Sequence, residues 1–154
     1  MDGSARLTLR AVGAVDGYHE VEPLLHRHYD EIAKFKDLAV VNPDLDRYAK
    51  IDAEGRFIGL IAENEGQIVG YSANFIAQNL HYSDLRYCQN DVLYVVPEHR
   101  DSRMGLSLIR QTVKCAKEKG AQLMLWHAKD KTTLDILLPR LGYEIMDIIW
   151  AKRI

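Results

Sequence analysis

The sequence predicts an α/β (α+β) fold in which helices flank a mixed β-sheet. Amphipathic stretches with apolar residues three and four positions apart alternate with short runs of strand-forming residues. The expected order is strand, two helices, three strands, helix, strand, helix and strand, which indicates helices layered on a sheet. The 154 residues contain no internal repeat, low-complexity tract or Pro/Gly/Ser-rich linker, so we expect residues 1–154 to form one domain.

The first half of the chain predicts five elements, each supported by a local pattern. Glycines at positions 13 and 17 separate the first strand from the long helix, and Asn42-Pro43 interrupts the helical pattern. A polar turn over residues 63–66 joins two strands as an antiparallel hairpin. The expected elements are an alternating, half-buried strand (6–12), an amphipathic helix (18–36), a short helix (45–52) and two strands rich in β-branched and aromatic residues (57–62 and 67–77).

The second half predicts five further elements, which follow a polar, irregular segment over residues 81–89. Pro97 ends the first strand because it lacks the N–H that a central ladder needs. Gly120 stops the first helix, and Pro139 distorts the last turn of the second. The expected elements are a strand (91–96), a helix (105–119), a strand (122–126), a helix (132–141) and a final strand (142–150).

The composition excludes several classes of protein. Twenty basic and 22 acidic residues give a net charge of −2, which argues against a nucleic-acid partner. The cluster of Arg100, Arg103 and Arg110 keeps nucleic-acid binding as a weaker alternative, which would fall steeply with salt. No apolar run approaches the roughly 20 residues that span a bilayer, so we expect no membrane partner.

The two cysteines, Cys88 and Cys115, lack the spacing of a redox or zinc motif, so we expect reduced thiols and no metal site. Residues 1–10 lack the apolar core of a signal peptide. Together these features predict a cytoplasmic protein.

Residues 91–107 are the segment that indicates chemistry, because a strand, a polar loop and a helix start follow one another. The first turn of a helix leaves backbone N–H groups free, and these groups favour a phosphate. Gly105 would allow the phosphate to approach closely, and Arg100 and Arg103 could add charge-assisted hydrogen bonds. The alternative is an ordinary strand-loop-helix with a surface arginine pair.

Residues 95–105 (VVPEHRDSRMG) resemble motif A of the GNAT acetyltransferases, V-x-P-x-x-[RQ]-x-x-G-x-[GA]. Arg100 matches the [RQ] position and Gly105 the final glycine, whereas Arg103 stands where the first glycine is usual. Residues 141–144 (LGYE) resemble the family's L-G-[FY]-E signature. Phage and bacterial members resemble the chain most, especially in the His81-Tyr82 pair before the motif-A strand.

The resemblance implies a mostly antiparallel sheet of six to seven strands with about four helices, and acetyl-CoA as co-substrate. It implies that the pantetheine arm lies in a V-shaped gap between two strands, where Val95 and Val96 offer backbone groups. It also implies a pyrophosphate cradle followed by the first helical turn; these two parts comprise Arg100, Asp101, Ser102, Arg103, Met104 and Gly105, and then Leu106 and Ser107.

The implied activity is direct transfer of an acetyl group to a primary amine. Asp91 is the candidate general base, and strand alternation would place it on the same face as Leu93 and Val95. His81 and Tyr82 are further catalytic candidates in the segment before that strand. The alternatives are a turn-capping role for Asp91 and a solvated loop for His81 and Tyr82.

Two questions stay open in the sequence. Leu138 occupies the position where the family often has a general-acid tyrosine, so Tyr82 or water would protonate the thiolate, or the chain is a non-catalytic acyl-CoA-binding module. The loop over residues 37–47 is acid-leaning, with Asp37, Asp44 and Asp46; its composition is typical of a solvated polar loop, and the alternative hypothesis is that it faces a positively charged acceptor such as a lysine or polyamine. The sequence also leaves a homodimer open.

Overall fold

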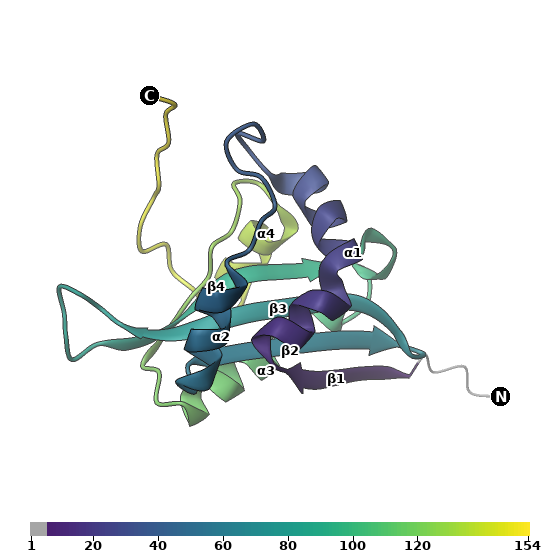
Figure 1. Cartoon of the computed structure of the whole chain (residues 1–154), viewed down its shortest axis with the longest axis horizontal. Coiled ribbons are helices and arrows are strands. Elements are labelled where there is room, and N and C mark those ends of the chain that lie inside the picture. Colours follow the sequence, from purple (N-terminus) through teal and green to yellow (C-terminus); the bar gives the residue numbers. More distant parts are fainter. Residues whose placement is uncertain (1–5) are drawn as a thin grey trace.

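A five-stranded sheet forms the centre of the molecule in the computed structural model, which describes residues 6–154 (Figure 1). Its strand order is β1-β2-β3-β4-β5, antiparallel except for the parallel β4–β5 pair. The elements are β1 (Leu7–Val12), α1 (Ala14–Ile32), α2 (Leu45–Ala53), β2 (Phe57–Asn64), β3 (Gln67–Gln78), β4 (Arg86–Val95), the 3₁₀ turn η1 (Pro97–His99), α3 (Met104–Glu118), β5 (Leu123–Leu125) and α4 (Thr133–Arg140). The predicted fold class is therefore confirmed.

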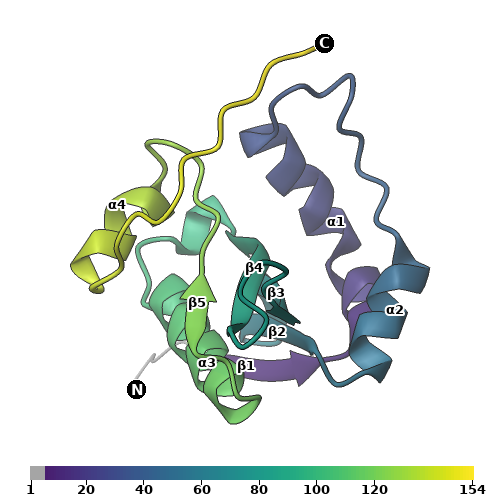
Figure 2. The same cartoon turned by 90° about the vertical axis from the view of Figure 1, so that its left-hand side faces the viewer.

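Helices cover both faces of the sheet. α1 and α2 lie on one face, and α3 lies on the opposite face, with α4 on the same side as α3 (Figure 2). Apolar side chains from the strands and from α3 fill the interior, and the largest fully buried ones include Ile61, Ile76, Met104 and Leu108. Within residues 6–154, no helix is both long enough and apolar enough to cross a membrane.

A buried polar network fixes β3, β4 and α3 relative to one another. The Asn90 amide donates to Asn74 Oδ1 at 2.8 Å, and the Asn74 amide donates to Ser72 Oγ at 2.8 Å. Ser72 Oγ lies 3.3 Å from Thr112 Oγ1 of α3. Because buried polar groups are costly when unpaired, this chain of bonds selects one strand register.

The α1 helix begins earlier than predicted, at Ala14 instead of residue 18, and ends at Ile32. The Ala14 N–H donates to Asp52 Oδ2 of α2 at 2.8 Å, which anchors the start of the helix. Gly17 lies inside the helix, at a position where a Cβ would come within 2.8 Å of the Val12 side chain. In the sequence, Gly17 suggested a break before the helix. In the structure, its lack of a side chain permits close packing of α1 on β1.

The β4 strand also begins earlier than predicted, at Arg86 instead of residue 91. Residues 86–90 pair with residues 78–74 of β3, and this pairing holds a polar stretch in strand conformation. The hairpin between β2 and β3 turns through Glu65 and Gly66, both with positive φ, which is typical of a tight two-residue turn.

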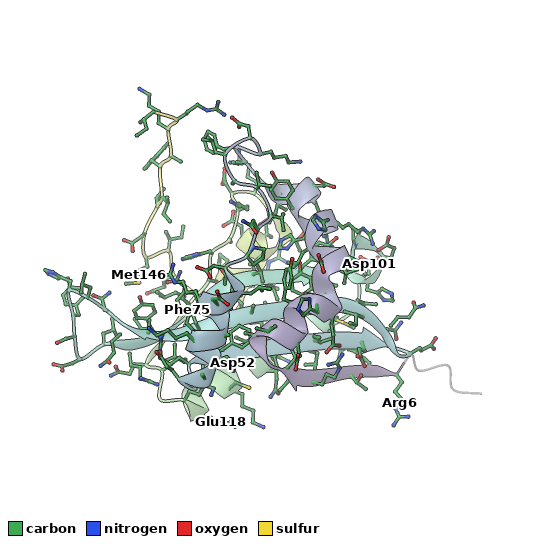
Figure 3. All side chains as sticks on the ribbon, in the orientation of Figure 1. Arg6, Asp52, Phe75, Asp101, Glu118 and Met146 are labelled. Atoms are coloured by element: carbon green, nitrogen blue, oxygen red, sulfur yellow. The ribbon has the colours of Figure 1, made fainter. Side chains whose placement is uncertain are left out.

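The predicted final strand over residues 142–150 does not form. Residues 143–154 run as an extended segment away from the sheet, and Met146, labelled in Figure 3, is exposed. An extended segment needs a ladder partner to become a strand, and the described residues provide none for it. The described sheet therefore has five strands instead of the expected six to seven.

Candidate functional site

A gap opens between β4 and β5 along the outer edge of β4. The two strands pair only from Tyr87–Leu123 to Gln89–Leu125. β5 ends there, whereas β4 continues to Val95. The second half of β4 therefore borders β3 on one side and has no strand on its other side within the described residues.

Strand geometry decides which backbone groups face this gap. The Val96 N–H donates to the Val69 carbonyl at 2.9 Å, and the Val96 carbonyl accepts from the His99 N–H at 2.9 Å. Backbone groups of successive residues alternate between the two edges of a strand, so those of Leu93 and Val95 face the gap. Of the two valines predicted to offer backbone groups, Val95 lies at the gap, while Val96 is bonded within the chain.

The start of α3 adjoins the end of this gap. Its first intrahelical hydrogen bond runs from the Ser107 N–H to the Arg103 carbonyl at 2.9 Å, so the N–H groups of Gly105 and Leu106 precede the helical ladder. A Cβ on Gly105 would lie 3.9 Å from the Val95 side chain, with no closer obstacle. Free helical N–H groups beside an open strand edge form a setting that suits an anion attached to an extended arm.

The loop before α3 is held by short local bonds. The Ser102 hydroxyl donates to the His99 carbonyl at 2.5 Å, and the Met104 N–H donates to that hydroxyl at 3.3 Å. Met104 is fully buried, whereas Asp101, Ser102 and Arg103 are exposed. Arg103 caps the helix with its backbone and forms no ion pair within residues 6–154.

Arg100 points away from this loop and toward α1. Its guanidinium donates to both carboxylate oxygens of Glu31 at 2.5 and 2.8 Å, and its Nε donates to the Val95 carbonyl at 2.9 Å. The same group lies 5.5 Å from the centre of the Tyr94 ring. Arg100 lowers the pKa of Glu31 below its usual value. In this structure Arg100 therefore links the loop to α1, and its contact with a phosphate stays a prediction.

Asp91 is an extra residue in β4, and this decides where its side chain points. Ala73 of β3 pairs with Val92 and Asn74 pairs with Asn90, which leaves Asp91 in a β-bulge. Its carboxylate accepts a hydrogen bond from the Tyr48 hydroxyl of α2. Asp91 therefore faces the α1 and α2 side of the sheet.

The prediction that Asp91 shares a face with Val95 is wrong. Val95 contacts the α3 side, near Gly105 and Gly70, whereas Asp91 faces α2. Simple alternation fails because the bulge inserts one residue, so that Asp91 and its neighbour Val92 both face the α1 and α2 side.

Comparison with known proteins decides the family, because the model of the "Acetyltransferase (GNAT) family" matches residues 19–143. The chain belongs to the GNAT acetyltransferase family. Membership indicates acyl transfer to an amine. A search of curated protein sequences gives no match.

Solved structures of other acetyltransferases share the fold. A ribosomal-protein-alanine N-acetyltransferase from Brucella melitensis has a TM-score of 0.69 at 19% identity, covering 97% of this chain and 99% of that chain. A GCN5-related N-acetyltransferase from Ralstonia eutropha has a TM-score of 0.75 at 18% identity, covering 97% and 99%. An aminoglycoside acetyltransferase from an uncultured soil metagenomic sample, in complex with sisomicin, has a TM-score of 0.71 at 18% identity, covering 96% of both chains.

Tyr48 of this GNAT chain contacts the candidate base Asp91, and the sequence did not reveal this contact. Burial, followed by the nearby Asp91 carboxylate, raises the pKa of the Tyr48 phenol above its usual value. Its ring packs edge-to-face on Phe57 with 6.1 Å between ring centres. A tyrosine on a short amphipathic helix gives no sequence signal for this role, because only the tertiary packing of α2 brings it to β4.

An apolar cavity of about 120 Å³ adjoins the Asp91–Tyr48 pair. It lies between α1, α2 and strands β1 to β4, and Tyr48 and Val92 both line it. The remaining walls are formed mostly by aliphatic and aromatic groups, which include Val12, Val21, Phe57 and Ala73.

A buried aromatic cluster lies beside Arg100, on the α1 side of the sheet. His28 is 8% exposed, its Nδ1 lies 3.1 Å from the Tyr71 hydroxyl, and its ring stacks on Tyr94 at 4.6 Å. Burial lowers the pKa of His28 to about 4, so its imidazole is neutral at pH 7. The buried Tyr94 hydroxyl has no hydrogen-bond partner in the part of the chain that the structure describes.

His81 and Tyr82 lie far along the hairpin from Asp91. They occupy the turn between β3 and β4, which projects beyond the helices (Figure 1). Both N–H groups donate to Asn79 Oδ1, at 2.9 and 2.8 Å, and the Tyr82 side chain is 64% exposed. The structure therefore does not bring these two catalytic candidates together with Asp91, and their catalytic role stays a prediction.

The described residues contain no group of three His, Cys, Asp or Glu side chains placed to hold a metal ion. Both cysteines are free thiols, with Cys88 buried. Burial raises the pKa of the Cys88 thiol to about 12, so it is not a thiolate nucleophile at neutral pH.

Proposed function

We propose that this GNAT chain is an N-acetyltransferase that moves an acetyl group from acetyl-CoA to a primary amine by direct attack. The observation that carries the proposal is the open edge of β4 running into the free N–H groups at the start of α3. Acetyl-CoA supplies an activated thioester, an extended amide-containing arm and a diphosphate. Those three features match a reacting centre near the bulge, an unpaired strand edge and a helix start.

Each part of the site then has a task. The amides of Gly105 and Leu106 bind the diphosphate, and the exposed Arg103 adds positive charge. The gap-facing backbone groups of Leu93 and the N–H of Val95 hold the arm, because the Val95 carbonyl already accepts from Arg100. Arg100 keeps the loop in place through Glu31 and the Val95 carbonyl, which makes it a positioning residue.

Asp91 is the proposed general base. It accepts a proton from the ammonium of the acceptor, so that the free amine can attack the thioester carbonyl. The C–S bond then breaks, coenzyme A leaves as its thiolate, and the proton lost by the attacking nitrogen passes through water to the thiolate sulfur. The bulge points its carboxylate to the α1 and α2 side, and the Tyr48 hydroxyl fixes its orientation.

The acidic loop between α1 and α2 favours an acceptor with a single positive charge. Asp37 pairs with Arg153 at 2.6 Å, and the Asp44 carboxylate caps α2 by accepting from the Arg47 N–H at 3.0 Å. Two of the three carboxylates that suggested a polycation are therefore engaged within the chain. This leaves Asp91 as the acid best placed for the acceptor ammonium.

The proposal is tested by incubating the protein with isotope-labelled acetyl-CoA and a panel of primary amines, read by mass spectrometry. We expect labelled N-acetyl product, and we expect Asp91→Asn to lower kcat about 100-fold or more while acetyl-CoA affinity is retained. Asp84→Asn, on the exposed β3–β4 turn, is the matched control and should keep full activity.

Undiminished kcat in a folded Asp91→Asn variant would show that Asp91 is not the general base. Acetyl-CoA binding with no product from any amine would support the non-catalytic acyl-CoA-binding alternative, which the leucine at position 138 keeps open.

A further inference from the structure

The cavity between α1, α2 and the sheet is distinctive because its walls are almost wholly apolar although it adjoins a carboxylate. Its volume is about 120 Å³, and the side chains of Val12, Val21, Phe57 and Ala73 contribute to its lining. An apolar cavity of roughly 150 Å³ inside a protein stays dry and takes up a benzene-sized molecule. The cavity in this chain therefore suits a compact hydrocarbon group.

The bulge in β4 connects this cavity to the proposed base. Because Asp91 is the extra residue, it and Val92 face the same side, and Val92 lines the cavity. Tyr48 belongs to both features, since its hydroxyl donates to Asp91 and its side chain lines the cavity. The Asp91 carboxylate is thus joined by one hydrogen bond to a side chain of the cavity wall, and this arrangement suits an amine that also carries an apolar group.

We propose that the acceptor is a primary amine on a short stem that carries a compact apolar group of about the size of a phenyl ring. The ammonium pairs with Asp91, and the apolar group occupies the cavity. This inference depends on the proposed acetyl transfer and names the class of acceptor. A polyamine or a free amino acid would place a second charge against apolar walls, and burying such a charge without a partner is costly.

The test is a kinetic series with purified protein, acetyl-CoA and four amines: ethylamine, isobutylamine, 2-phenylethylamine and putrescine. We expect kcat/KM to rise along the first three and to be at least 10-fold higher for 2-phenylethylamine than for ethylamine or putrescine. A gain of about fourfold for each buried methylene is typical of apolar pockets. This comparison uses the wild-type chain and does not depend on the folding of a variant.

A substitution that fills the cavity adds a second readout. Ala73→Leu should lower the ratio of kcat/KM for 2-phenylethylamine to that for ethylamine by about 10-fold, because its side chain would occupy the apolar space. Ala53→Leu, the same change at an exposed position of α2, should leave this ratio unchanged.

The outcomes separate the two levels of the proposal. Equal or faster acetylation of ethylamine or putrescine would overturn the apolar-acceptor inference and leave the acetyltransferase proposal standing. An unchanged ratio in folded Ala73→Leu would also overturn the inference. The absence of product from every amine, with acetyl-CoA bound, would overturn both.

Discussion

At the scale of single residues, Asp91 shows how one insertion changes the chemistry that a strand presents. Sequence alternation placed Asp91 with Val95, whereas the bulge sends it to the opposite face, toward Tyr48. The resemblance to the family could identify the Asp91 carboxylate as a candidate, because it implies an acidic general base on the motif-A strand. It could not locate the bulge, since its position depends on which β3 residues pair with β4.

His28 is the residue whose titration the structure predicts most directly. It is buried and neutral, with its pKa lowered to about 4 by burial and by the facing Arg100 and Lys129, while Glu31 acts in the opposite direction. In the unfolded chain its pKa is close to 6.5, so the unfolded state binds a proton first as pH falls. The stabilisation from a neutral His28 is therefore complete above about pH 6.5 and is lost as pH falls toward 4.

We expect His28→Phe to flatten the pH dependence of stability. The free energy of unfolding of the wild-type chain should lose up to about 1.4 kcal/mol per pH unit between pH 6 and pH 4.5 through this group. The variant should lack this component even if its stability at pH 7 is lower. Urea denaturation at pH 7, 6, 5 and 4.5 measures the slope, and His19→Phe at an exposed position of the same helix is the control. Equal slopes in wild type and His28→Phe would contradict the assignment.

At the scale of elements, the strand-loop-helix unit around residues 91–107 is the part that the sequence predicted best. The proline ended the strand, and the helix began one residue from its expected start, because both events follow from local chain chemistry. The partner of Arg100 could not be foreseen in the same way. Glu31 lies on α1, 69 positions earlier in the chain, and only the packing of α1 on the sheet brings the two together.

The start of α3 offers a substitution that separates folding from binding. Gly105 has open space around its Cβ direction and does not have a positive φ, so larger residues fit there without backbone strain. Gly105→Glu places a negative charge in the first turn of a helix, which is favourable for the helix and unfavourable for a bound diphosphate.

We therefore expect Gly105→Glu to unfold at the same temperature as the wild type or higher, and to bind acetyl-CoA at least 10-fold more weakly. Gly105→Ala is the uncharged control. Thermal denaturation and isothermal titration calorimetry measure the two quantities. Wild-type affinity in the folded Gly105→Glu variant would show that the diphosphate does not bind at this helix start.

At the scale of the whole molecule, the sequence predicted the order of nine elements but not the course of the last. Residues 143–154 contain strand-type residues, yet their side chains are exposed: Ile145, Met146, Ile148, Ile149 and Trp150 are all more than 60% exposed. Local propensity alone cannot supply a ladder partner, which is why a strand-like sequence does not always give a strand. The predictions of β1 to β4 as strands are correct because each of these strands pairs with a neighbouring strand in the sheet.

In the proposed complex, acetyl-CoA lies along the outer edge of β4 with its diphosphate at the start of α3. Backbone ¹H–¹⁵N NMR spectra of the isotope-labelled chain, recorded during titration with acetyl-CoA, test this most directly. We expect the largest shifts at the amides of Leu93, Val95, Gly105 and Leu106, with little change in the β3–β4 turn around His81. Shifts confined to other parts of the chain, or unchanged spectra at saturating acetyl-CoA, would contradict it.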